Sequence, residues 1–270
     1  MKYGKLLLTA FAAGGFLGLS GVAQADEPIA LQYDLYVAGI KVYQIGLSGQ
    51  VAPNGFKTQV SMRPAGLGSI FSSDQTDMRT TGTVASGQPK PANFEMRLNE
   101  RQYKVSWSGS ALPTTYRSKQ LSEDRDREVT AALNPSLTDP LTAVMRLALS
   151  DTASSCALTQ RVYNGKEIYE FALSPAGAVK LDSSSGGAYL GPAKKCKLAY
   201  RTIAGYSQKV MKKNQQNPPD ITLLVAPVKG ADGKPLMVIV GGSGTIDGRS
   251  FTARLSSAAL AGKPLQTAAQ

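Results

Sequence analysis

The stretch "FEMRLNERQYKVSW", residues 94–107, alternates apolar and polar side chains on both sides of a short turn at Asn99–Arg101. The apolar positions that share one parity are Phe94, Met96, Leu98, Tyr103, Val105 and Trp107. An alternation with period two predicts a β-hairpin with one apolar face and one solvated face. We therefore expect this hairpin to belong to an antiparallel sheet that covers a hydrophobic core on one side.

The same pattern extends over most of the chain. It appears in "IALQYDLYVAGIKVYQIGLSGQV" (29–51), "LTQRVYNGKEIYEFAL" (158–173) and "KCKLAYR" (195–201). Asn-Gly pairs at 54–55 and 164–165 predict tight turns between strands. The segment "LMVIV" (236–240) is apolar on both parities, so it is either covered on both faces or meets a ligand on one of them.

One segment predicts a helix, near residues 139–150. Asp139 is a typical N-cap residue, and Pro140 suits the first helical position. The apolar stripe of this helix comprises Leu141, Val144, Met145, Ala148 and Leu149. The charged run "SEDRDRE" (122–128) is interpreted as a solvated loop or edge, and "KKNQQNPPD" (212–220) as a surface loop.

The first 25 residues have the pattern of a secretory signal peptide. Lys2 and Lys5 precede a small and apolar run that ends in "AQA" at Ala25. A transmembrane helix is the alternative, but the run is short and rich in glycine. We expect a signal peptide over 1–25, a single β-rich domain over 26–262 and a flexible tail over 263–270.

The chain is basic. Its 30 Lys and Arg against 19 Asp and Glu give a formal charge of +11, which falls to +9 without Lys2 and Lys5. A positive surface favours anionic partners such as lipid headgroups and acidic glycans. Nucleic acid is a poor candidate, because an exported protein seldom meets it.

The two cysteines, Cys156 and Cys196, predict a disulfide. Cysteines of exported chains usually pair, and the chain has no histidine to complete a zinc site or to activate a thiol. Both cysteines have the apolar parity of the segments around them, which suits a bond between facing strands.

The absence of histidine also excludes Ser-His-Asp, Cys-His and HExxH chemistry. Paired carboxylates remain available for glycan hydrolysis, and the pairs close in sequence are Asp74 with Asp77 and Asp124 with Asp126. Both pairs lie in polar connections, where a solvated surface is the favoured interpretation. No catalytic residue, metal or cofactor is predicted.

Three stretches resemble a known group of proteins: "YDLYVAGIKV" (33–42), "CALTQRVYNGKEIYEFAL" (156–173) and "CKLAYRTIAGY" (196–206). They resemble an alphaproteobacterial family of exported periplasmic proteins known as a domain of unknown function. More distantly, the chain is similar to envelope integrity protein B and to the half-barrels that carry lipoproteins, although it has no lipidation cysteine. The resemblance implies a periplasmic location, a strongly curved sheet around a helix, a concave apolar face and a disulfide between Cys156 and Cys196.

Together these observations predict a mainly β fold: a single antiparallel, strongly curved open or spiral-like barrel with one main α-helix and one disulfide. The expected function is non-enzymatic support of the cell envelope by binding a lipid, a glycan or an envelope protein. The alternatives are a carboxylate-dependent glycan or lipid hydrolase and a purely structural scaffold.

Two candidate sites follow from the strand parities. An interior ligand site would be lined by Leu67, Ile70, Phe71, Phe94, Met96, Tyr103 and Trp107. A basic patch for anionic headgroups or acidic glycan would comprise Lys195, Lys197, Arg201, Lys209, Lys212 and Lys213. Contact with a membrane, if any, would be peripheral.

Overall fold

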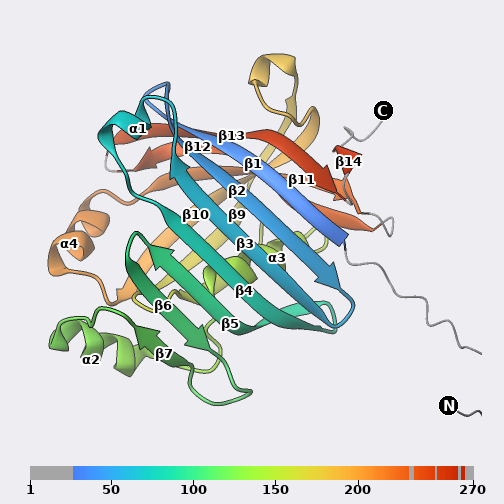
Figure 1. Ribbon diagram of the computed structural model, residues 1–270. Coiled ribbons are helices and arrows are strands. Elements are labelled where there is room, and N and C mark those ends of the chain that lie inside the picture. Colours follow the sequence, from blue (N-terminus) through green and yellow to red (C-terminus); the bar gives the residue numbers. More distant parts are fainter. Residues whose placement is uncertain (1–26, 231–233, 247, 261–262, 265–270) are drawn as a thin grey trace, which may run out of the picture.

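The structure is a computed structural model that describes residues 27–230, 234–246, 248–260 and 263–264 (Figure 1). The predicted signal peptide and nearly all of the predicted tail lie outside the described residues. Among the described residues, no helix has the length and apolar content needed to cross a bilayer.

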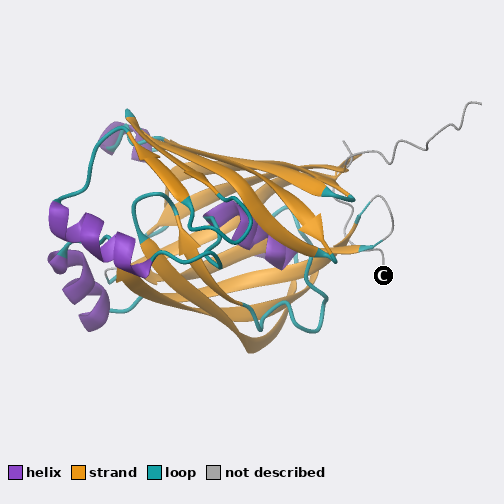
Figure 2. Cartoon of the chain, turned by 90° about the horizontal axis from the view of Figure 1, so that it is seen from below, coloured by secondary structure: helices purple, strands orange, loops and turns teal. Residues whose placement is uncertain are grey.

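A single antiparallel sheet of fourteen strands dominates the fold. The strand order is β7-β6-β5-β4-β3-β2-β1-β13-β12-β11-β10-β9-β8, and β14 pairs with β13. The strands are β1 (Glu27–Val37), β2 (Ile40–Ala52), β3 (Gly55–Pro64), β4 (Thr76–Ala85), β5 (Gln88–Leu98), β6 (Arg101–Ser106), β7 (Thr114–Arg117), β8 (Thr159–Tyr163), β9 (Ile168–Leu181), β10 (Gly191–Ala204), β11 (Asp220–Lys229), β12 (Pro235–Ile246), β13 (Arg249–Leu260) and β14 (Lys263–Pro264). The sheet curls around a central helix but does not close through backbone pairing (Figure 2). The predicted open, mainly β barrel is confirmed.

The hairpin over 94–107 is confirmed as β5 and β6. Phe94 pairs with Val105 and Met96 pairs with Tyr103, so their side chains share one face. Asn99 adopts a positive φ of 54° in the turn, a conformation that asparagine tolerates better than most residues.

The predicted helix is confirmed as α3 (Pro140–Ala148), which lies inside the curved sheet. The Asp139 carboxylate caps it by accepting hydrogen bonds from the amides of Leu141 and Thr142, both at 2.9 Å. At the other end of α3, Arg146 donates to the carbonyl of Pro89 at 2.9 Å and to the side chain of Gln160. The bonds of Arg146 attach this end of the helix to β5 and β8.

Two other predictions about helices were wrong. The run 122–128, expected as a loop or edge, forms most of α2 (Glu123–Ala132), whose single buried residue is Val129. Three acidic residues in its first turn favour the helix through the macrodipole. Residues 212–216, expected as a loop, belong to α4 (Gln208–Gln216), which Ser207 caps and which ends before Pro218.

Three hydrophobic clusters fill the fold. The first joins the Ile29 end of β1 to Leu236, Val238 and Val240 of β12. The second lies between the β5–β6 hairpin and helices α2 and α3, and the third surrounds the disulfide. The segment 236–240 is therefore covered on both faces, because the alternate residue Met237 belongs to the third cluster. Of the two alternatives for this segment, coverage on both faces is therefore correct, and contact with a ligand on one face is not.

The predicted disulfide between Cys156 and Cys196 is confirmed, with the two Cα atoms 5.2 Å apart. Cys196 lies in β10, but Cys156 lies in a turn that precedes β8 rather than on a strand. The bond therefore ties this turn to the sheet beside Leu147 of α3.

The two edge strands of the sheet, β7 and β8, meet through side chains. The Thr115 and Tyr163 hydroxyls are 2.9 Å apart, and Arg117 donates to the Gly165 carbonyl at 2.6 Å and to the Tyr163 hydroxyl at 2.9 Å. We call this contact between β7 and β8 the seam.

Candidate binding groove on the outer sheet face

The hairpin residues predicted to face a ligand belong to the hydrophobic core. Phe94 and Tyr103 are each 2% exposed, and Met96 is also buried. They pack with Val129 of α2 and Leu141 of α3. No ligand can reach these side chains without displacing packed helices, so the prediction for Phe94, Met96 and Tyr103 is corrected on this ground. Trp107 lies half-buried at the edge of the same cluster.

The other predicted ligand residues lie elsewhere. Leu67 is 52% exposed and Ile70 is 71% exposed, at helix α1 (Gly68–Phe71). A Cβ atom on Gly68 would come 2.1 Å from the Val42 carbonyl oxygen, so the backbone of α1 rests directly on β2. Leu67 and Ile70 consequently remain accessible to solvent and do not join the hairpin residues. The side chain of Phe71, the remaining predicted residue of this group, lies outside the described part of the structure.

The predicted basic patch is divided between β10 and α4. Lys197 forms an ion pair with Asp220, and Arg201 forms one with Glu170 at 2.9 Å. Lys195 lies at a bulge of β10 and is half-buried. Lys209, Lys212 and Lys213 lie on the exposed helix α4. Acidic partners therefore neutralise part of the predicted patch.

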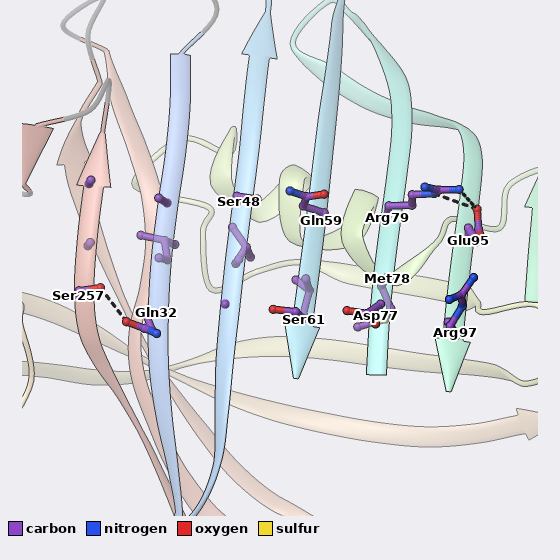
Figure 3. Close-up of a pocket in the computed structure, with 17 residues that line it drawn as sticks. Gln32, Ser48, Gln59, Ser61, Asp77, Met78, Arg79, Glu95, Arg97 and Ser257 are labelled. Atoms are coloured by element: carbon purple, nitrogen blue, oxygen red, sulfur yellow. Dashed lines mark hydrogen bonds and ion pairs between the residues drawn. The ribbon is translucent and has the colours of Figure 1, made fainter. Parts of the chain in front are cut away.

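A hollow of about 950 Å³ occupies the outer face of the sheet, on the side opposite α3 (Figure 3). It crosses six adjacent strands, β13, β1, β2, β3, β4 and β5. Val60 and Met78 contribute to the lining of this hollow but pack against the core around α2 and α3. We call this hollow the outer groove.

The strand register explains why a sheet face is hollow here. One cross-strand row consists of Ala259, Ala30, Ser48, Gln59, Arg79 and Glu95. The next row consists of Ser257, Gln32, Gly46, Ser61, Asp77 and Arg97. Apart from Gln32 on β1, both rows place small side chains on β13, β1 and β2, and both place charged side chains on β4 and β5. The small residues form a floor, and the long charged residues form a wall along one side of it (Figure 3).

Hydrogen bonds and ion pairs fix most of the charged wall. Glu95 accepts from Arg79 Nε at 2.9 Å and from Gln102 Nε2 at 2.5 Å. Partial burial raises the pKa of Glu95, but the bonds from Gln102 and Arg79 and the nearby positive charges outweigh it and hold the pKa below its usual range. Asp77 pairs with Arg63 at 2.6 Å. Both carboxylates of the wall therefore already have cationic partners.

Arg97 differs from the other charged residues of the outer groove. Arg97 lies opposite Asp77 in the register of β4 and β5, but the Asp77 carboxylate forms its ion pair with Arg63. Within the part of the chain that the structure describes, the Arg97 side chain has no hydrogen bond or ion pair. Its guanidinium is therefore a cation in the wall whose charge no acidic neighbour neutralises.

The groove contains no carboxyl group prepared to act as a general acid. Among the described carboxyl groups, the one with a raised pKa is that of Asp139. Burial is the cause of this shift, and the group lies inside the curved sheet, away from the groove. Of the sequence-predicted pairs, Asp124 and Asp126 are bound to Arg127 and Arg117, while Asp74 accepts from Asn99 at 2.8 Å. No group of three acidic or cysteine side chains that would suit a metal ion occurs among the described residues.

Most residues of the outer groove were missed at the level of sequence. Their alternation identifies them as outward-facing, and an outward polar residue is ordinarily just solvated. The signal that was present is the run of small outward residues in β1, β2 and β13, notably Ala30, Gly46, Ser48 and Ala259.

Comparison with known proteins gives limited information. No protein-family model matches the chain, and no curated protein matches it. Among solved structures, it is similar to a beta-barrel-like protein of the domain of unknown function DUF1849 from Brucella abortus. The two chains are 9% identical, the TM-score is 0.47, and the match covers 87% of this chain and 97% of the other. A likeness at this level carries no conclusion about function, and the similarity to envelope integrity protein B stays a prediction.

Proposed function

We propose that this protein is a non-enzymatic component of the bacterial periplasm that binds an anionic glycan strand in the outer groove and thereby supports the cell envelope. The observation that carries the proposal is the outer groove itself, with its small polar floor and its uncompensated Arg97.

The dimensions of the groove suit an extended chain. Six strands at about 4.8 Å spacing span about 24 Å, and the groove runs across them. The length is enough for several linked sugars, whereas a single small molecule would leave much of it empty. Its open, shallow form suits a polymer that enters and leaves along its length.

The side chains of the groove match the chemistry of sugars. Gln32, Gln59, Ser48 and Ser61 offer amide and hydroxyl groups that both donate and accept hydrogen bonds, as sugar hydroxyls require. Arg97 can bind the carboxylate of an acidic sugar through two parallel hydrogen bonds. The charge of the groove therefore favours acidic over neutral glycans.

A lipid ligand is less well supported. An acyl chain requires an apolar lining, but the outward rows of the groove consist of small, amide, hydroxyl and charged side chains. The larger apolar residues that also line the hollow are packed into or against the hydrophobic core: Leu31, Leu47, Val60 and Met78. Phe94, Met96 and Tyr103, which were expected to face a lipid, pack instead against α2 and α3. A hydrolase is also less well supported, because the groove carboxylates are paired with arginines and Glu95 has a lowered pKa.

The sequence pattern of residues 1–25 and the disulfide support the proposed compartment. Disulfides persist in oxidising compartments such as the periplasm, and the pattern of residues 1–25 predicts export. Both observations support an envelope location.

Isothermal titration with oligogalacturonate and with a neutral malto-oligosaccharide of equal length tests the proposal. We expect the acidic chain to bind more tightly, and Ser48→Tyr to abolish its binding by filling the floor. Thr81→Tyr is the matched control, because Thr81 is exposed on β4 outside the groove. Equal binding by the Ser48→Tyr variant and the wild type would contradict the proposal, as would the absence of binding by either.

A further inference from the structure

Exposed apolar side chains gather at one end of the barrel. Eight large apolar residues are exposed among the described residues. Five of them are Ile40, Leu67, Ile70, Val210 and Ile246, with exposed fractions between 39 and 71%. Isolated exposed apolar residues are ordinary, but a group of protruding ones indicates an interaction surface.

The strand pairing places these five residues at the same end. Ile40 begins β2 at the β1–β2 turn, opposite Val37, which in turn pairs with Phe251 near the start of β13. Ile246 ends β12 at the neighbouring β12–β13 turn. Leu67 and Ile70 lie in the β3–β4 connection, where the Ala65 amide bonds the Val42 carbonyl of β2 at 2.9 Å. Val210 lies on α4, in the connection that leads into β11 at the same end.

Figure 1 shows α1, α4 and these strand turns on one side of the molecule. We call this end, with Ile40, Leu67, Ile70, Val210 and Ile246, the apolar rim. The start of β1, the end of β13 and the long β9–β10 connection lie at the opposite end.

Local backbone geometry makes these side chains protrude. Gly66 has a positive φ of 57°, and both Gly66 and Gly68 contact the backbone of Lys41 or Val42 where a Cβ atom would not fit. The backbone of α1 therefore packs directly against β2, and the side chains of Leu67 and Ile70 remain exposed. Helix α4 has no buried residue, so it too rests on the surface.

The charge around the apolar rim is positive. Helix α4 contains Lys209, Lys212 and Lys213 and no acidic residue. Of the described carboxylates at this end, Asp34 pairs with Lys41 at 2.6 Å, Asp220 pairs with Lys197, and Asp74 accepts from Asn99. Two of these carboxylates, Asp34 and Asp220, are thus neutralised by lysines, whereas α4 adds Lys209 and Lys212 to this end without an acidic residue of its own.

We propose that the apolar rim docks the protein onto a membrane surface that contains anionic phospholipid. The protruding apolar side chains enter the boundary between headgroups and acyl chains, and the α4 lysines lie against the phosphates. Peripheral proteins commonly combine these two contributions, because burial of a few apolar side chains alone gives weak attachment. A polar protein partner would leave the five apolar side chains without a suitable environment.

This docking is compatible with glycan binding but independent of it. The floor of the outer groove is built from the middle and far parts of β1 and β13, whereas the rim consists of turns and short helices at one end. A protein docked by its rim would hold the groove beside the membrane, open to solvent. Failure of glycan binding would therefore leave the membrane proposal standing, and the reverse also holds.

Vesicle co-sedimentation tests the proposal with phosphatidylcholine vesicles and with mixed phosphatidylcholine–phosphatidylglycerol vesicles. We expect the full mature protein to bind the mixed vesicles, to bind neutral vesicles at least about tenfold more weakly, and to dissociate as salt rises. The Leu67→Ser/Ile70→Ser variant should lose about tenfold or more in affinity, since two apolar side chains no longer enter the lipid. Lys209→Gln/Lys212→Gln should bind more weakly and with less dependence on salt.

Leu112→Ser and Leu190→Ser provide matched controls. Leu112 and Leu190 are also exposed apolar residues, but they lie in connections at the opposite end of the barrel. Their variants should bind like the wild type. A tryptophan placed by Ile70→Trp should be quenched by brominated lipid, and one placed by Leu112→Trp should not.

Several results would overturn the proposal. They are equal binding to neutral and anionic vesicles, no vesicle binding at all, unchanged binding by Leu67→Ser/Ile70→Ser, and equal losses in the Leu112 or Leu190 variants. Sedimentation velocity distinguishes membrane docking from self-association of the protein. Concentration-dependent dimers that Leu67→Ser/Ile70→Ser dissolves, without vesicle binding, would assign the rim to contact between copies of the chain instead.

Discussion

The hydroxyl oxygen of Thr80 lies 3.0 Å from Oδ2 of Asp139, inside the curved sheet. This contact joins β4 to the N-terminus of α3 over a separation of 59 residues. The same carboxylate caps the helix through the amides of Leu141 and Thr142. One buried carboxyl group therefore both starts the helix and attaches it to the sheet.

Removal of this carboxyl group should destabilise the whole domain. Asp139→Ala loses the helix cap and leaves buried donors unsatisfied, so the free energy of unfolding should fall by about 2–4 kcal/mol. Asp139→Asn keeps an acceptor for the helix amides and should cost less. Urea denaturation of the three proteins measures the difference, and an alanine variant as stable as the wild type would refute this role for Asp139.

Asp139 should also contribute to the pH dependence of stability. Burial raises the pKa of its carboxyl in the folded state, although hydrogen bonds from Thr142, Thr80 and Leu141 oppose the shift. The folded state then holds a proton that the unfolded state releases from about pH 4 upward. The contribution of Asp139 to stability is therefore present in full below about pH 4 and declines as pH rises through the folded pKa.

Urea denaturation of the wild type and Asp139→Asn between about pH 4 and neutrality isolates this contribution. The stability difference between the two proteins should shift in favour of the asparagine variant as pH rises. A difference that is constant with pH, or that shifts in favour of the wild type, would contradict the raised pKa.

Loss of the disulfide should weaken the fold without changing ligand binding. Replacement of Cys156 or Cys196 by serine should lower the free energy of unfolding by about 2–5 kcal/mol, because the unfolded chain regains its freedom. Binding of oligogalacturonate at a temperature where the variant remains folded should be unchanged, since neither cysteine lines the outer groove. Two titratable thiols in freshly isolated wild-type protein would show that the bond does not form in the cell.

Phe94 should behave as a core residue. Phe94→Ala removes a ring that is 2% exposed, so we expect a loss of about 3–5 kcal/mol in denaturant unfolding. Leu112→Ala, at an exposed position, should change stability by about 0.5 kcal/mol or less. A Phe94→Ala variant that remains as stable as the wild type but loses affinity for a fatty acid would restore the interior ligand site.

Arg97 should determine the preference for acidic glycans. Arg97→Ala should weaken oligogalacturonate binding by about tenfold, which corresponds to the loss of one charge-assisted contact. Binding of the neutral malto-oligosaccharide should hardly change. Lys229→Ala removes the same charge from a strand outside the groove and serves as the control. Equal losses in both variants would indicate a non-specific effect of net charge.

Strand alternation and helix signals predicted the parts of the fold that depend on local pattern. The hairpin of β5 and β6 has a clean period of two, and α3 has both an N-cap aspartate and an apolar stripe. Helices α2 and α4 lack such a stripe of buried residues: α2 buries only Val129 and α4 buries none. Their polar sequences have the composition of loops, so the helical state was not evident.

The outer groove could not be predicted because it depends on register. Ala30, Ser48 and Ala259 form one small-residue row only when β13, β1 and β2 pair in the observed alignment. A shift by one residue would place each of them on the other face. Phe94, Met96 and Tyr103 are packed in the core partly because α2 supplies Val129 to it, a residue that the sequence pattern did not assign to the interior.

The seam and the segment beside it determine what the sheet presents to other molecules. The Thr138 amide donates to the Arg161 carbonyl at 3.0 Å, and the Tyr163 amide donates to the Thr138 carbonyl at 2.8 Å, so backbone groups of β8 are already paired on its outer side. Side chains of β7 turn its short edge toward the seam. An uncovered edge is a template for edge-to-edge polymerisation of β proteins. Thr138 therefore covers the backbone groups at the β8 edge, and the seam holds the short β7 edge against β8, so neither edge is left open to an added strand from a neighbour.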